Sequence, residues 1–69
     1  MIKKTNSMKF KYGDRVKFKD EFYGEGIGII KKRILASGGY YFEYLIVVIS
    51  GKSKGNAFWI TEHLLEKIK

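Results

Sequence analysis

The chain has 69 residues, of which 45% are hydrophobic and 16% aromatic, and fourteen Lys and Arg against seven Asp and Glu give a net charge of +7. This length allows one small domain, and the apolar content excludes disorder. The chain has no cysteine and one histidine, which excludes disulfides and a metal site built from thiolates or imidazoles. The positive surplus favours phosphate-rich or acidic partners and excludes a DNA-mimicking inhibitor, which needs the opposite sign.

The N-terminal residues 1–8 show no periodicity and are expected to form a flexible tail before a domain at 9–69. Their basic start is not followed by the apolar stretch of a signal peptide. The longest apolar run, residues 45–49, is far shorter than the ~20 residues that span a bilayer. We therefore expect a cytoplasmic protein without membrane contact.

Beyond the tail the sequence alternates as a strand does, with apolar residues at even positions and basic residues at odd positions. The break at Gly13 and Asp14 predicts a turn or bulge in which the aspartate accepts backbone N–H groups. The first strand follows at 15–19, with Val16 and Phe18 in the core.

The later elements are marked by glycines, polar turns and a cap. In chain order we expect a folded-back loop at 20–28, a strand at 29–35, a hairpin connection at 36–39, the longest strand at 40–49, a polar turn at 50–56 and a fourth strand at 57–60. Thr61 then caps one helical turn at 61–65, and 66–68 forms a fifth strand; a longer helix over 61–69 is the alternative.

Five short strands, glycine turns and one helical turn before the last strand predict an all-β domain, a small and strongly bent antiparallel barrel. Three segments resemble the SH3-like barrel superfamily: Gly13–Phe18, the glycine-spaced Gly24–Ile30 and Trp59–Ile68. That superfamily includes KOW modules of ribosomal and transcription proteins, Tudor-type domains, a photosystem I peripheral subunit and type II dihydrofolate reductases. The resemblance covers roughly residues 10–69 and implies the five-stranded SH3-like barrel, but its motifs are structural and leave several functions open.

Both faces of the predicted strand 40–49 are apolar apart from Glu43, although a barrel of this size buries one face. One explanation is a sharp bend that places the strand in two half-sheets, with the tail, a loop or the terminal helix covering the rest. The other is an oligomer or partner interface formed by Leu45, Val47 and Ile49.

The basic residues concentrate near the N-terminus: residues 1–19 hold seven basic residues and one acidic residue, against a charge of −3 at 20–26. Phosphate binding needs several Lys and Arg together, and nearby aromatics can stack on bases. The predicted nucleic-acid surface consists of Lys9, Lys11, Arg15, Lys17, Lys19, Lys31, Lys32 and Arg33. The other interpretation is a solvated strand face on which lysines protect an edge.

Aromatic residues offer a second candidate, a cage or groove built from Phe22, Tyr23, Tyr40, Tyr41 and Trp59. A groove for proline-rich peptides is not expected, because the Ala-Leu-Tyr-Asp-Tyr motif of true SH3 domains is missing. For Trp59, a core position on the fourth strand is favoured over a ligand position. The predicted partner surface consists of Tyr23, Tyr41, Leu45, Val47 and Trp59.

Neither catalytic residues nor a cofactor or metal site are predicted. His63 has no serine, cysteine or paired carboxylate beside it in a catalytic pattern and is expected at the surface. In the type II dihydrofolate reductases that the chain resembles, the active pore depends on a Val-Gln-Ile-Tyr strand. Residues 57–60 read Ala-Phe-Trp-Ile, so the resemblance does not extend to that activity.

The sequence thus favours a non-enzymatic module that binds nucleic acid or a ribonucleoprotein through the basic strand face. The alternative is a protein–protein interaction module, such as a phage or mobile element directs at a host complex, or a homo-oligomer, using the apolar strand 40–49 and Trp59. Charge reversal at Lys31, Lys32 and Arg33 separates the two, because it abolishes only the first activity.

Overall fold

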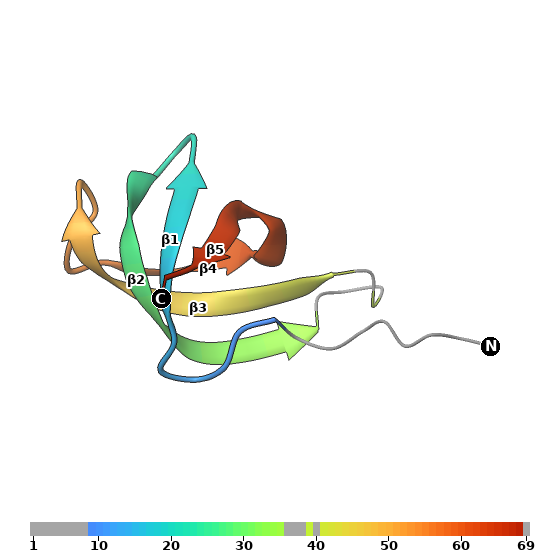
Figure 1. Cartoon of the computed structure of the whole chain (residues 1–69). Helices are drawn as coiled ribbons and strands as arrows, with labels where there is room; N and C mark the ends of the chain where they lie inside the picture. Colours follow the sequence, from blue (N-terminus) through green and yellow to red (C-terminus); the bar gives the residue numbers. More distant parts are fainter. Residues whose placement is uncertain (1–8, 36–38, 40, 69) are drawn as a thin grey trace.

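The structure, a computed structural model of the whole chain, describes residues 9–35, 39 and 41–68. Five antiparallel strands form one sheet in the order β4-β3-β2-β1-β5 (Figure 1). The elements are β1 (Arg15–Asp20), β2 (Gly24–Leu35), β3 (Phe42–Gly51), β4 (Ala57–Thr61), the 3-10 turn η2 (Glu62–Leu64) and β5 (Leu65–Lys67). The expected all-β architecture, with five strands and one helical turn before the last, is confirmed. The predicted tail at 1–8, the predicted connection at 36–39 except Gly39, and Tyr40 lie outside the described residues.

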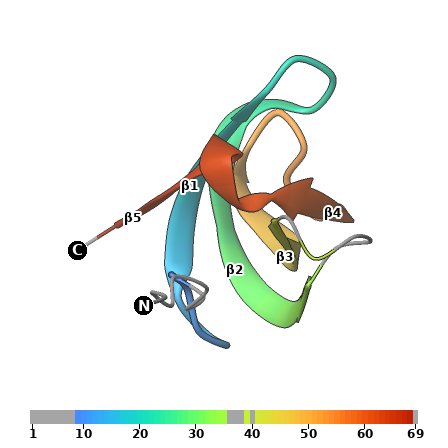
Figure 2. The same ribbon diagram turned by 90° about the vertical axis from the view of Figure 1, so that its right-hand side faces the viewer.

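The sheet is strongly curved, with β2 and β3 bending between β1 and β5 on one side and β4 on the other (Figure 2). The pairing of β2 with β3 skips one residue on each strand: Lys31, between Ile30 and Lys32, and Ile49, between Val48 and Ser50. These are β-bulges, which bend a strand and increase its twist.

Val16 and Phe18 of β1 point into the core, as the alternation predicts, and so do Tyr44, Ile46 and Val48 of β3. Val16 and Phe18 are fully buried, and Phe10 covers one end of the core, with its ring 5.4 Å from that of Tyr44 in an edge-to-face contact. The core consists of Phe10, Val16, Phe18, Ile30, Tyr44, Ile46, Val48, Phe58, Ile60 and Leu65.

The prediction of a loop over 20–28 is wrong, because β2 already begins at Gly24 and is the longest strand, with twelve residues against ten in β3. The glycines of this segment make room for close packing. A Cβ on Gly26 would lie 2.3 Å from the backbone oxygen of Ser50, and one on Gly28 would lie 2.9 Å from Cδ1 of Ile46. Of the three glycines in the segment, Gly24 has a positive φ, at 80°.

The connection between β1 and β2 is a tight turn held by Asp20. Its Oδ2 accepts the backbone N–H groups of Phe22, at 2.8 Å, and Tyr23, at 2.9 Å. An aspartate that satisfies two backbone donors replaces the longer loop that the glycine and acid content suggested.

At the C-terminus the alternative of a helix over 61–69 is wrong, since β5 follows a single 3-10 turn. Thr61 occupies the N-cap position but makes no side-chain capping hydrogen bond, so the predicted threonine cap is wrong as well. The extended backbone at Thr61 and Leu65 on either side limits the turn to three residues.

Candidate nucleic-acid and partner interface

The outer side of β1 carries exposed cations, as predicted. Arg15, Lys17 and Lys19 are exposed and alternate with the buried Val16 and Phe18. Side chains at alternate positions of a strand lie on the same face, so these three cations form one row about 6.6 Å apart along the strand.

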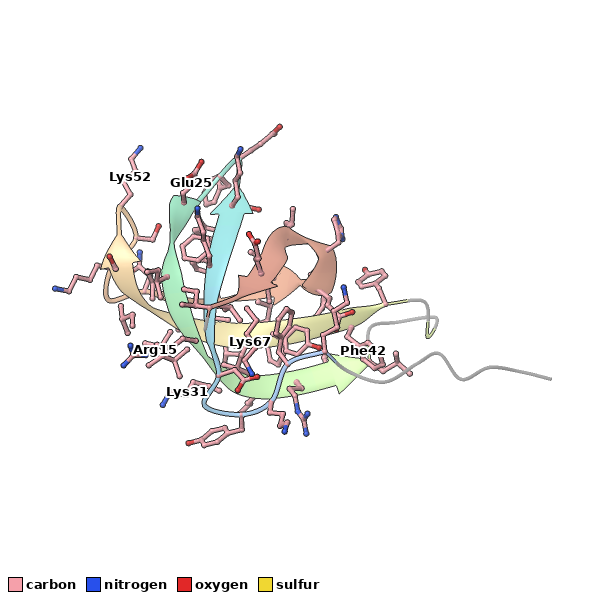
Figure 3. All side chains as sticks on the ribbon, in the orientation of Figure 1. Arg15, Glu25, Lys31, Phe42, Lys52 and Lys67 are labelled. Carbon is pink, nitrogen blue, oxygen red and sulfur yellow. The ribbon has the colours of Figure 1, made fainter. Side chains whose placement is uncertain are left out.

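The second group of predicted cations, residues 31–33, lies just beyond the start of β1. The pairing of β1 with β2 ends at Arg15 and Ile29. The turn before β1 continues it, since Gly13 N–H donates to Ile30 at 2.8 Å and Ile30 N–H donates to Asp14 at 3.0 Å. The basic residues of β2 therefore adjoin the turn at 11–14, and Figure 3 shows Arg15 and Lys31 extending toward the same side of the molecule.

The register separates Arg33 from the other two cations of this group. Arg33 pairs with the buried Tyr44 and Lys32 pairs with Leu45, so the two point to opposite faces of the sheet. The Arg33 guanidinium donates to the Phe10 carbonyl at 3.2 Å. Arg33 thus holds the N-terminal segment on the core, and its exposed side chain lies on the other face of the sheet from Lys32.

Lys31 sits on the bulge, with its Nζ 5.7 Å from the centre of the Tyr12 ring, within the range of a cation–π contact. Tyr12 is 70% exposed, so this pair lies at the surface. Lys9 and Lys11 are exposed on the same N-terminal segment, and their backbone N–H groups donate to the carboxylates of Glu62, at 3.0 Å, and Asp14, at 2.8 Å.

Two of the three cations of β1 lie opposite a glutamate on a neighbouring strand, and the third does not. Lys19 lies opposite Glu25, with an ion pair of 3.8 Å between their exposed side chains, and Lys17 lies opposite Glu66 on β5. Arg15 lies opposite Ile29. Because these two lysines face a carboxylate on a neighbouring strand, the positive charge of the face concentrates at Arg15 and at Lys31 and Lys32.

The outer side of β3 and β4 is apolar at Leu45, Val47, Ala57 and Trp59, where two rows of residues cross the sheet, and it ends beside a polar row formed by Glu43 and Thr61. Arg15, Ile29, Val47 and Ala57 pair in sequence across β1, β2, β3 and β4, and Lys32, Leu45 and Trp59 do so across β2, β3 and β4. We call these seven residues, together with Lys31, the outer face. Its aliphatic side chains at 29, 45 and 47 are half-buried. The bend of the first interpretation of strand 40–49 is therefore present, and the outer side of β3 is incompletely covered. An oligomer or partner interface at Leu45, Val47 and Ile49 stays a prediction.

Trp59 is 43% exposed on this face, whereas its neighbours Phe58 and Ile60 are buried. The favoured core position for Trp59 is therefore wrong. Its pairing with Leu45, which faces outward, fixes the orientation, because partners in an antiparallel pair share a face.

Of the predicted aromatic cage, Phe22 and Tyr23 are in edge-to-face contact with ring centres 4.8 Å apart, Trp59 lies apart from them, and Tyr40 is outside the described residues. Tyr23 stacks on Phe58, with ring centres 3.6 Å apart and planes at 3°, on the inner side of the sheet and opposite to Trp59. Tyr41 is 46% exposed just before β3, and Phe22 is 82% exposed in the β1–β2 turn. Of the predicted partner residues, the structure brings Leu45, Val47 and Trp59 together, and it places Tyr23 against the core.

A buried polar contact fixes the segment that carries Lys9 and Lys11. The Tyr44 hydroxyl donates to the Glu62 carboxylate at 2.5 Å, and the same carboxylate accepts from Lys9. Burial, and then the hydrogen bond to Glu62, raise the pKa of Tyr44 to about 12. Glu62 thus joins Tyr44, 18 positions away, and Lys9, 53 positions away, and no local sequence pattern indicates these contacts.

Asp14 has the role that the sequence predicts for it. Its carboxylate accepts the Lys11 backbone N–H and lies 3.4 Å from the Lys67 ammonium. The backbone hydrogen bond, followed by the contact with Lys67, lowers the pKa of Asp14 below its usual value of 3.8. These contacts shape the turn against which Lys31 lies.

His63 is exposed and borders an open hollow of about 570 Å³ between β1 and the 3-10 turn, whose other walls include Lys17, Lys19, Leu64 and Glu66. Within residues 9–35, 39 and 41–68, no group of three or more His, Cys, Asp or Glu residues could hold a metal ion. Over the same residues, no helix has the length and apolar character needed to cross a membrane.

No family model matches the chain, and no curated protein or solved structure is similar enough to it to count as a match.

Proposed function

We propose that the chain is a cytoplasmic, non-enzymatic module that binds nucleic acid through Arg15, Lys31 and Lys32. The carrying observation is that these three exposed cations adjoin one another on the outer face and pair with apolar residues or none, whereas Lys17 and Lys19 each face a glutamate. A family assignment to the SH3-like barrels is proposed on the sequence motifs given above.

The physical basis is the phosphate backbone. Cations that neutralise phosphates release condensed counterions, which makes affinity fall steeply with salt. Within the described part of the chain, ion pairs shorter than 4.0 Å join Lys19 to Glu25 and Lys67 to Asp14, and none involves the three proposed cations. Their charge is therefore available to a polyanion.

The test is a salt titration of oligonucleotide binding, followed by fluorescence anisotropy of a labelled strand from about 50 mM salt upward. With three phosphate contacts, the logarithm of the affinity should fall with the logarithm of salt with a slope of about −2 to −3. Undetectable binding near 50 mM salt, or affinity that does not depend on salt, would overturn the proposal.

A matched pair of variants places the contact on the outer face. Arg15→Glu with Lys32→Glu removes two proposed contacts, and Lys52→Glu with Lys54→Glu makes the same change of net charge, from +7 to +3, in the β3–β4 turn. Figure 3 shows Lys52 far from Arg15 and Lys31. We expect the first variant to lose at least about tenfold in affinity and the second only a few-fold.

Equal losses in the two variants would mean that net charge and not the outer face determines binding. Arg33 is left unchanged in this design, because its side chain holds Phe10. The alternative function, a protein-interaction module on the apolar residues of the face, predicts that the wild-type chain binds no oligonucleotide and that partner capture survives the Arg15 and Lys32 changes.

A further inference from the structure

In both rows of the outer face, a cation is followed by apolar residues. One row runs from Arg15 through Ile29 and Val47 to Ala57, and the other from Lys32 through Leu45 to Trp59. Each row thus begins with a cation on β1 or β2 and becomes apolar toward β4. With strands about 4.8 Å apart, the apolar part extends about 14 Å beyond Arg15 and about 10 Å beyond Lys32.

The spacing of the rows is that of an extended ligand. On β3 the rows are two residues apart, at Leu45 and Val47, which corresponds to about 6.6 Å. Successive phosphates in a stacked duplex strand advance about 3.4 Å along the helix axis. Because a duplex strand winds around its axis, its successive phosphates are farther apart than this axial advance. The row spacing therefore suits consecutive nucleotides of either kind of strand, and the apolar residues decide between them.

A duplex would make few favourable contacts with the apolar residues of the outer face. Its bases are paired and stacked inside, so a flat face meets mainly sugar and phosphate, and half-buried Leu45 and Val47 would gain little against charged oxygens. Unpaired bases expose apolar ring faces that pack on aliphatic side chains and stack on indole. Trp59, 43% exposed at the apolar end of its row, is placed to accept such a ring.

We propose that the ligand is a single-stranded polynucleotide whose phosphates lie along Arg15, Lys31 and Lys32 and whose bases lie over Leu45 and Val47, with one base stacked on Trp59. This inference rests on the proposed function and adds the strandedness of the ligand and the position of its bases. The other charge-compatible occupants, a duplex and an acidic protein, are outcomes of the test.

The experiment uses three probes with the full chain: an oligothymidylate and an oligouridylate of about 15 nucleotides, and a duplex of the same length. Because Trp59 is the only tryptophan of the chain, its fluorescence reports directly on stacking. We expect single strands to bind at least about tenfold more tightly than the duplex and to quench Trp59 along the same curve as the anisotropy. The two single strands differ in the sugar and in the 5-methyl group of the base, and a preference for either supports the proposal.

Variants at Trp59 separate stacking from simple apolar contact. Trp59→Phe keeps a ring and should retain affinity within a few-fold, whereas Trp59→Leu should lose roughly 5- to 150-fold for single strands, the range of one stacked base. Phe22→Leu removes a more exposed aromatic ring beside the acidic residues of the β1–β2 turn and should leave the affinity unchanged.

The failures are distinguishable. Equal affinity for duplex and single strand, with unchanged Trp59 fluorescence and a neutral Trp59→Leu variant, would overturn this inference and leave the proposed function intact. No binding of any of the three probes near 50 mM salt would overturn both, and it would leave a protein partner as the occupant of the face.

Discussion

The hydroxyl of Tyr44 donates a 2.5 Å hydrogen bond to the carboxylate of Glu62 and so connects the N-terminal part of β3 to the 3-10 turn. Tyr44 is fully buried at the level of the whole residue, so its hydroxyl needs this partner. Since Glu62 also accepts the backbone N–H of Lys9, the contact joins three segments of the chain.

Tyr44→Phe should lower the free energy of unfolding by about 1.5–3 kcal/mol, the usual contribution of a hydrogen bond to a charged group. Urea denaturation followed by circular dichroism measures the change. Tyr41→Phe is the control, because the Tyr41 side chain is 46% exposed and lies outside this contact. Equal midpoints for wild type and Tyr44→Phe would show that the hydrogen bond adds nothing to stability.

The raised pKa of Tyr44 predicts a loss of stability at alkaline pH. Its pKa rises from 10.0 in the unfolded chain to about 12 in the fold, so the neutral hydroxyl is favoured by folding. The stabilisation is complete below pH 10 and is lost as the pH rises toward 12. The difference in unfolding free energy between wild type and Tyr44→Phe should therefore shrink over this interval; a constant difference would contradict the assignment.

Asp14 predicts the opposite dependence at acid pH. Because its folded pKa is lowered below 3.8, the contribution of the carboxylate is present above about pH 4 and is lost as the pH falls through the folded value. Asp14→Asn should flatten the acid limb of the stability curve. Lys67→Gln should flatten it less, because the hydrogen bond from the Lys11 backbone is the larger cause of the shift. A larger effect from Lys67→Gln would reverse that order of causes.

Gly26→Ala tests whether the glycines of β2 serve packing. The added methyl would meet the Ser50 backbone oxygen at 2.3 Å and the Phe18 ring at 3.0 Å, so a backbone shift is required. We expect a loss of about 3 kcal/mol or more in unfolding free energy, or failure to fold. Gly55→Ala, where nothing lies within 4 Å but φ is 93°, should lose about 1–2 kcal/mol from strain alone. A smaller loss of unfolding free energy for Gly26→Ala than for Gly55→Ala would show that β2 and β3 do not approach closely at Gly26.

The neighbours Phe58 and Trp59 should respond differently to truncation. Phe58 is buried between Tyr23, on which it stacks, and Phe18, whose ring lies 5.5 Å away, so Phe58→Ala should lose about 3–5 kcal/mol. Trp59→Ala should lose about 1 kcal/mol or less, because the side chain lies on the outer face. Thermal unfolding of both variants measures the contrast, and a larger loss at Trp59 would return that residue to the core.

Much of the fold could be predicted, because residue alternation has a direct physical meaning. Val16 and Phe18, between cations on β1, match the inner face that the structure shows. On β3 both faces are apolar, so the sequence does not single out Tyr44, Ile46 and Val48 as the buried set. The role of Asp14 also follows from local chemistry, since a short carboxylate beside a glycine turn accepts nearby backbone donors.

The remaining features depend on partners distant in the sequence. Glycines are common in loops, so Gly26 and Gly28 by themselves indicate a loop as readily as a strand. Only the position of β3 shows that a side chain at either residue would collide with the neighbouring strand. In the sequence Arg33 belongs to a run of three cations. In the structure Lys31 has no partner on β3, which shifts the pairing by one residue and places Arg33 on the inner face opposite Tyr44. The position of Trp59 on the fourth strand favours the core, whereas its alternation with the buried Phe58 and Ile60 places it on the other face, as in the structure.

The two bulges in the β2–β3 hairpin compensate each other. One extra residue is on β2, at Lys31, and the other is on β3, at Ile49, so both strands use the same number of residues between the end pairs Gly26–Gly51 and Leu35–Phe42. The pairs at the two ends of the hairpin therefore keep the same register, although the pairs between the two bulges are shifted by one residue. Relatives of this chain that differ in length within the sheet should gain or lose a residue at these two places, where the change alters local twist and leaves every end pair unchanged.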